Sequence, residues 1–112
     1  MKASSRQARQ TIRNRTRTQR AASRITRRGN GSLTTHCLAA GLTPKEARTV
    51  ASSLRKAATK LGIHGLAART HAAGRMRTCH RYTPTQVAAL AVIYRPRKAA
   101  YVQAAARLAL AA

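Results

Sequence analysis

Large apolar side chains are scarce in the first 32 residues and recur at helical spacing over the rest of the chain. Between residues 44 and 61 they repeat with the period of an α-helix, and basic or polar residues occupy the opposite side. The apolar side of this predicted helix consists of Ala47, Val50, Ala51, Leu54, Ala58 and Leu61.

Two further helices are expected, over 84–94 and 97–111, because Pro96 should interrupt a single longer one. The first would bury Val87, Leu90, Ala91 and Tyr94. The second, rich in alanine, would place Tyr101, Val102, Ala105 and Leu108 on one side. So neutral a final helix is expected to pack on the core or on a second copy of the chain.

Two segments carry the same helix-start signal. Thr43 suits the N-cap, Pro44 suits the first helical position, and Glu46 completes a capping box. Segment 83–86 repeats this arrangement with Gln86 in place of the glutamate, either as a degenerate internal repeat or because the same local physics is used twice. Glu46 is the only acidic residue of the chain, and its expected position in a helix cap argues against a catalytic carboxylate.

The helical period is lost between residues 63 and 82, where the residues after Gly74 alternate in character. Arg75, Arg77, Cys79 and Arg81 fall on one side, and Met76, Thr78, His80 and Tyr82 on the other. Period two predicts a β-strand, the second arm of a hairpin that turns near Ala73-Gly74. A basic loop is the alternative.

A short helix is also expected from Leu33, ended by Gly41 just before the capped helix. A short helix, a tight turn and a capped helix with one basic face resemble a helix-turn-helix over residues 33–61, with an ordinary helical hairpin as the alternative. Together with the basic hairpin over 63–82, the pattern resembles the winged helix-turn-helix DNA-binding proteins of phages and plasmids. The arginine- and alanine-rich composition is similar to that of small accessory proteins from GC-rich bacteria.

The resemblance implies a specific use of each element on DNA. The helix that begins at Pro44 would enter the major groove, where Lys45 and Arg48 are suited to contact guanine. The hairpin would lie against the DNA backbone as the wing. A homodimer on a two-fold site would suit this arrangement, although nothing in the sequence requires one.

Charge strengthens the expectation of a nucleic-acid partner. The chain of 112 residues has 23 lysines and arginines against one acidic residue, a formal charge of +22. A polyanion would relieve this repulsion, and nucleic acid is the commonest one. Anionic membranes and acidic proteins, such as a polymerase inhibited by this chain, are the alternatives. No apolar run approaches the ~20 residues of a membrane span and no signal peptide is evident, so we expect a cytoplasmic protein, nucleoid-associated or acting in the host cell of a phage.

Residues 1–32 contain ten of the basic residues and are expected to form a disordered arm. Seven arginines follow one another at steps of three or four, so a helix would align them along one stripe. We therefore expect an arm that is disordered alone and becomes helical on nucleic acid. A solvated basic tail with accidental spacing is the alternative.

The sequence thus predicts a mainly α protein: the arm, then a domain over 33–112 of about four helices with a helix-turn-helix and a hairpin wing. Double-stranded DNA is preferred as the partner, and an RNA-binding protein with an arginine-rich motif, antiterminator-like or ribosome-associated, is the runner-up. The predicted nucleic-acid contacts are Arg6, Arg9, Arg13, Arg17, Arg20, Arg24, Arg27, Arg28, Lys45, Arg48, Thr49, Ser52, Ser53, Lys56, Arg75, Arg77 and Arg81.

Neither a cofactor nor a small-molecule substrate is expected, and neither is enzymatic activity. Four residues could in principle ligate zinc, namely Cys37, His71, Cys79 and His80, but their spacing matches no common zinc motif. A buried thiol is the ordinary explanation for Cys37, and both cysteines are expected to be reduced. No glycine-rich phosphate loop and no pair of carboxylates is present.

Overall fold

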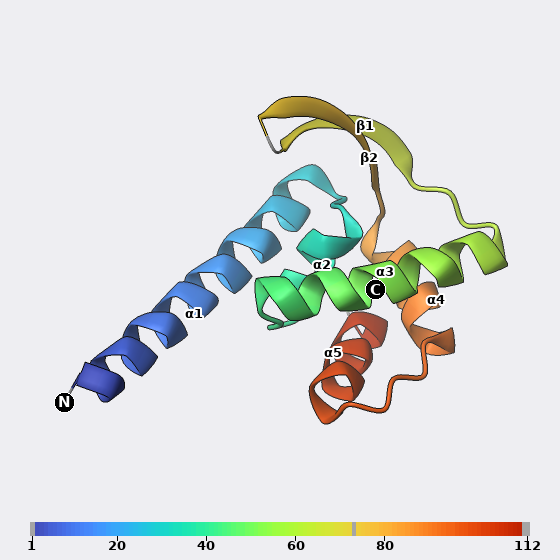
Figure 1. Cartoon of the computed structure of the whole chain (residues 1–112). Helices are drawn as coiled ribbons and strands as arrows, with labels where there is room; N and C mark the ends of the chain where they lie inside the picture. The colour runs from blue at the N-terminus through green and yellow to red at the C-terminus, as the bar shows by residue number, and fades with distance from the viewer. Residues whose placement is uncertain (1, 73, 111–112) are drawn as a thin grey trace.

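A computed structural model of the chain describes residues 2–72 and 74–110, and the side chains of 4–69 and 74–110. In chain order the elements are α1 (Lys2–Arg28), α2 (Leu33–Ala39), α3 (Pro44–Leu61), β1 (Leu66–Ala72), β2 (Arg75–Arg81), α4 (Pro84–Ile93) and α5 (Ala99–Leu110). The predicted architecture, mainly helical with a small antiparallel hairpin, is confirmed. In Figure 1, α1 extends away from the other helices, and the hairpin and α5 lie at opposite ends of the molecule.

The short helix α2 lies at the centre of the helical core. It packs against α1, α3, α4 and α5. α2 contributes Leu33 and Cys37 to the core. The largest of the other buried side chains come from α3 and α4. These are Val50, Leu54, Val87 and Leu90. The core contains no phenylalanine or tryptophan, so small aliphatic and alanine side chains must bring the helices close together.

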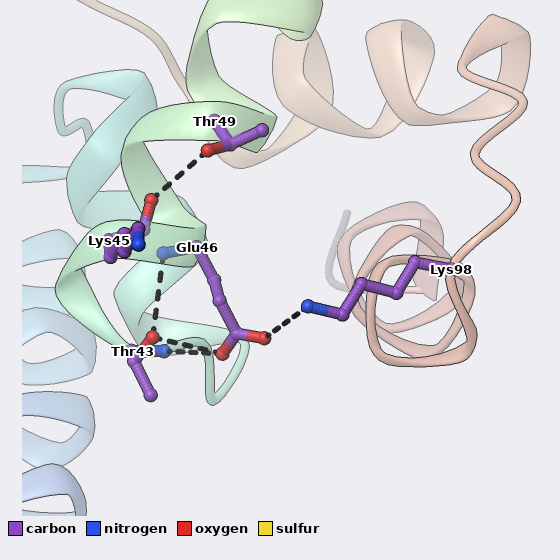
Figure 2. Close-up of polar contacts among 5 residues, drawn as sticks. All are labelled: Thr43, Lys45, Glu46, Thr49 and Lys98. Carbon is purple, nitrogen blue, oxygen red and sulfur yellow. Dashed lines mark hydrogen bonds and ion pairs between the residues drawn. The ribbon is translucent and has the colours of Figure 1, made fainter.

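The predicted helix boundaries rest on local signals that the structure reproduces. Thr43 Oγ1 accepts a hydrogen bond from Glu46 N, and the Glu46 carboxylate accepts one from Thr43 N at 3.2 Å (Figure 2). An equivalent capping box at Thr83 and Gln86 begins α4. Gly62 ends α3 with a φ of 71°, in the left-handed region that suits glycine.

Not every residue on the predicted apolar sides of the helices is buried. Leu61 is 46% exposed and Val102 is 47% exposed, while Tyr94 is only partly buried at the edge of the core. Leu61 is the last residue of α3, and the last buried residue of that helix is Ala58. In α5 the buried residues are Ala104, Ala105 and Leu108, because an alanine-rich helix offers several nearly equivalent apolar faces and its packing partners select one.

The last two helices are also shorter than predicted. α4 ends at Ile93, and α5 begins only at Ala99. Tyr94 is extended, as expected for the residues that approach Pro96. Residue 111, the end of the predicted helix, lies outside the described residues.

The hairpin over the predicted wing region is present, and the loop alternative is wrong. β1 and β2 pair antiparallel with Leu66 opposite Arg81 and Ala72 opposite Arg75. A further bridge joins Tyr82 to Gly31, with backbone hydrogen bonds of 2.7 and 3.0 Å. This bridge anchors the base of the hairpin to the link between α1 and α2.

Residues 2–28 form one continuous helix of 27 residues, about 40 Å long at 1.5 Å per residue. Only the last third of α1 is packed: Ala21 is buried and Ile25 partly buried, and this part contacts α2. From residue 4 to residue 20, no side chain is buried. The helical stripe of arginines is therefore present, and disorder of the free arm stays a prediction.

Candidate nucleic-acid interface

The exposed side of α3 is a basic and hydroxyl-bearing surface without an acidic residue. Its buried side is fixed in the core by residues such as Val50 and Leu54, so the helical period directs the intervening residues to solvent. The exposed residues are Lys45, Arg48, Thr49, Ser52, Arg55, Lys56, Thr59 and Lys60. This surface contains all the predicted contacts of the helix except Ser53.

Ser53 lies at the edge of the exposed side and is half-buried. Its hydroxyl donates a hydrogen bond to the backbone oxygen of Thr49 at 3.5 Å, and it lies against Tyr94 of the core. Ser53 is thus less accessible than the other predicted contacts of this helix, and its contact with nucleic acid stays a prediction. Thr49 remains exposed and donates to Lys45 O at 3.2 Å (Figure 2).

Arg55 is a basic residue of this surface that our prediction omitted. It lines a cleft of about 470 Å³ between the C-terminal half of α3 and β2. Thr59 lies on the α3 side of this cleft, and Thr78 and His80 on the strand side. The helical period could have identified Arg55, which follows Arg48 by two turns, but only the fold shows that it faces the hairpin.

The hairpin has two faces of different character, set by its register. Arg75, Arg77 and Arg81 lie on one face with Cys79, as predicted, and Arg69 of β1 lies on the other, opposite Thr78. Arg69, Arg75 and Arg77 are exposed, whereas Arg81 is half-buried at the base. The hairpin therefore presents positive charge on both faces.

The arginines of α1 form the third basic surface. Seven of them lie within roughly 80° of the helix circumference, at about 100° per residue. All seven are exposed, and so are Arg15 and Arg28 outside the stripe. The stripe runs from the free end of α1 to the base of the hairpin, where Arg24 and Arg28 line a small pocket together with Arg81.

Acidic side chains of the protein itself do not neutralise the positive charge of these three surfaces. The only carboxylate side chain, Glu46, is bound to its own helix cap and lies 3.6 Å from Lys98 Nζ (Figure 2). Hydrogen bonds from Thr43, backbone and then side chain, hold the pKa of Glu46 below its ordinary value, so that it is ionised at neutral pH. The arginines of α1, α3 and the hairpin therefore face solvent without an acidic neighbour.

Cys37, Cys79 and His80, the residues considered for zinc whose side chains are described, do not form a metal site. Cys37 is fully buried in the core, and burial raises its pKa to about 12, which disfavours the thiolate that zinc requires. Cys79 lies on the hairpin and His80 is exposed there, while the side chain of His71 lies outside those described. Within the described part of the chain, no three potential ligands cluster as a metal site would need.

No protein family, no curated protein and no solved structure with which we compared the chain matches it. None of the helices in the described ranges combines the length and the apolar character needed to cross a membrane.

Proposed function

We propose that this protein binds double-stranded DNA, with α3 as the helix that enters the major groove. The observation that carries the proposal is the exposed side of α3, where four lysines and arginines alternate with hydroxyls at helical spacing over residues 45–56 and no acid lies among them. Side chains of these types bind phosphates and read base edges. The Lys45 and Arg48 side chains are the ones best suited to guanine O6 and N7.

The position of the hairpin supports this arrangement. β2 lies across a cleft from Arg55, with Thr78 and His80 lining the cleft, and Arg69 of β1 lies on this same face of the hairpin. A hairpin that follows a groove-binding helix in this way can contact the DNA backbone beside the groove, as a wing does. We infer a regulator or an accessory factor of a mobile element, which acts by binding and catalyses no reaction.

Arg48→Ala tests the proposal directly. Duplexes selected from a random-sequence pool serve as the probe, and fluorescence anisotropy measures their affinity. Loss of a bidentate guanine contact should weaken binding to the preferred duplex by about 1–3 kcal/mol, a factor of roughly 5 to 150, with less effect on random duplexes.

The matched control is Arg95→Ala, which removes an exposed arginine between α4 and α5. It should leave the preference unchanged. If selection yields no preferred sequence, and Arg48→Ala and Lys45→Ala bind like the original chain, the role of α3 is refuted.

The continuous helix α1 specifically favours the second candidate, binding of structured RNA. A helix with seven arginines on one stripe and no buried side chain from residue 4 to residue 20 could insert into the deep groove of an RNA hairpin. Replacing Arg6, Arg9, Arg13 and Arg17 by glutamine distinguishes the two. DNA binding through α3 predicts that sequence preference survives this change while affinity falls, and the RNA mode predicts that preference is lost.

A further inference from the structure

Arg24, Arg28 and Arg81 line one small pocket although Arg81 lies more than fifty residues from the other two in the sequence. The pocket, of about 130 Å³, lies between the last turns of α1, the start of α2 and the end of β2. Its other lining residues are Asn30, Gly31, Ser32, Thr35 and Cys79. At about 30 Å³ per water molecule, it has room for a group of a few heavy atoms.

The floor of this pocket is fixed by backbone pairing. Gly31 N donates to Tyr82 O at 3.0 Å, and Tyr82 N donates to Gly31 O at 2.7 Å. A Cβ at Gly31 would lie 3.1 Å from Ile25 of α1 and 3.3 Å from Thr35 of α2, so the three segments meet closely there. The arginines therefore project around a preformed base.

Polar groups in the pocket are left with unused hydrogen-bonding capacity. The hydroxyls of Ser32 and Thr35 share one hydrogen bond of 2.9 Å, which leaves one hydroxyl hydrogen for another acceptor. Asn30 Oδ1 is buried without a partner among the described residues.

The charge around the pocket favours an anionic ligand. Arg24, Arg28 and Arg81 line it, and none of them forms an ion pair with a carboxylate in the described structure. Glu46, the only acidic residue, is engaged at the start of α3. Guanidinium groups match the oxygens of a phosphate in pairs, which suits this ligand better than a single-atom anion.

We propose that this pocket binds one phosphate group of the nucleic-acid backbone, held jointly by Arg24, Arg28 and Arg81. The inference rests on the proposed function for the source of the phosphate, but the pocket itself is a property of the link between α1 and the hairpin. A phosphate held there places α1 and the hairpin at fixed positions along the same nucleic-acid backbone. The pocket thus positions the protein and does not read sequence.

A double-mutant cycle tests whether the arginines share one ligand. Arg28→Ala and Arg81→Ala should each weaken binding to a duplex about tenfold, since each removes a charge-assisted hydrogen bond. The double variant should be far less than a hundredfold weaker, because the second change removes part of an interaction already lost. Its plot of log affinity against log salt should lose about 0.9 in slope, the value of one phosphate.

Arg9→Ala combined with Arg28→Ala is the matched control, because these residues lie 19 positions apart on α1 and should act independently. If the losses of duplex affinity in Arg28→Ala and Arg81→Ala are additive, as those of the control pair should be, the proposal of a shared site is overturned. Arg28→Lys retains charge without the paired donors and should restore only part of the affinity. Unchanged circular dichroism melting of the variants establishes that they fold.

Inorganic phosphate probes the pocket without nucleic acid. In a titration of the full chain followed by NMR, the Gly31 amide and the Nε–Hε signals of Arg28 and Arg81 should shift and saturate together, and Arg28→Ala should abolish the saturation. Saturation without binding to any DNA or RNA would refute the proposed function and leave the pocket standing. Unsaturated shifts spread evenly over all arginines, alongside sequence-specific DNA binding, would refute the pocket alone.

Discussion

At the scale of single residues, His36 connects the hairpin to the core. It is 4% exposed, and its Nε2 donates a hydrogen bond of 2.7 Å to the backbone oxygen of Tyr82. The same oxygen accepts from Gly31 N, so one carbonyl joins α2, the α1–α2 link and the base of β2. Burial lowers the pKa of His36 below its ordinary value, and the hydrogen bond to Tyr82 opposes this effect only in part.

His36 should therefore make the protein less stable in mild acid. The unfolded chain binds a proton near the ordinary pKa of about 6.5 more readily than the folded chain does, so stability is full above that pH and is lost as the pH falls below it. One such group accounts for at most about 1.4 kcal/mol per pH unit. Denaturant unfolding of His36→Gln between about pH 7 and about pH 5 should show a weaker pH dependence than the original chain.

The control for this prediction is His64→Gln, because His64 is exposed and contributes only its backbone oxygen to a hydrogen bond. It should retain the full pH dependence. Equal pH dependence in the original chain and in His36→Gln would contradict the assignment.

At the scale of elements, α1 differs from the other helices in what stabilises it. α2, α3, α4 and α5 bury side chains in a common core, whereas α1 buries only Ala21 among its described side chains. Along the rest of α1, arginines at positions three and four apart repel one another. Its outer two thirds therefore depend on the ions around them.

The helicity of α1 should rise when a polyanion is added. Circular dichroism at 222 nm, recorded with and without a duplex or inorganic phosphate, should show a gain of helix, because phosphates replace the repulsion between arginines by attraction. The variant with glutamine at positions 6, 9, 13 and 17 should gain much less. A polyanion that leaves the signal of the original chain unchanged would contradict this expectation.

At the scale of the whole molecule, the balance of charge sets the conditions under which the fold is stable. A charge of +22 on a chain of 112 residues produces repulsion that ion pairing relieves little, since the described structure has one ion pair, between Lys98 and Glu46. The principal extents of 51, 34 and 23 Å reflect the projecting α1, which carries part of this charge away from the core (Figure 1).

The thermal midpoint should therefore rise with ionic strength even without nucleic acid. Raising the ionic strength from about 0.01 M to about 1 M shortens the screening length from about 30 Å to about 3 Å and weakens the repulsion between α1, α3 and the hairpin. The four-glutamine variant of α1 lowers the formal charge from +22 to +18 and should show a smaller rise. The midpoint is measured by calorimetry in sodium chloride. A midpoint that does not change with salt would show that charge repulsion does not limit the stability of the folded protein.

Local signals in the sequence determined the elements of this protein. The capping boxes at Thr43 and Thr83, the stop at Gly62 and the alternation after Gly74 predicted where helices and strands begin and end, because each depends only on neighbouring residues. The exposed side of α3 was predictable for the same reason, since one helical period fixes both of its sides.

Only the tertiary structure decided which segments meet. The choice of the buried side of α5, the exposure of Leu61 and the covered edge at Ser53 all depend on neighbours that are distant in sequence. So does the position of Arg81 beside Arg24 and Arg28, more than fifty residues away along the chain. No local pattern encodes such proximity, because the bridge between Gly31 and Tyr82 joins backbone segments about 50 residues apart in the sequence.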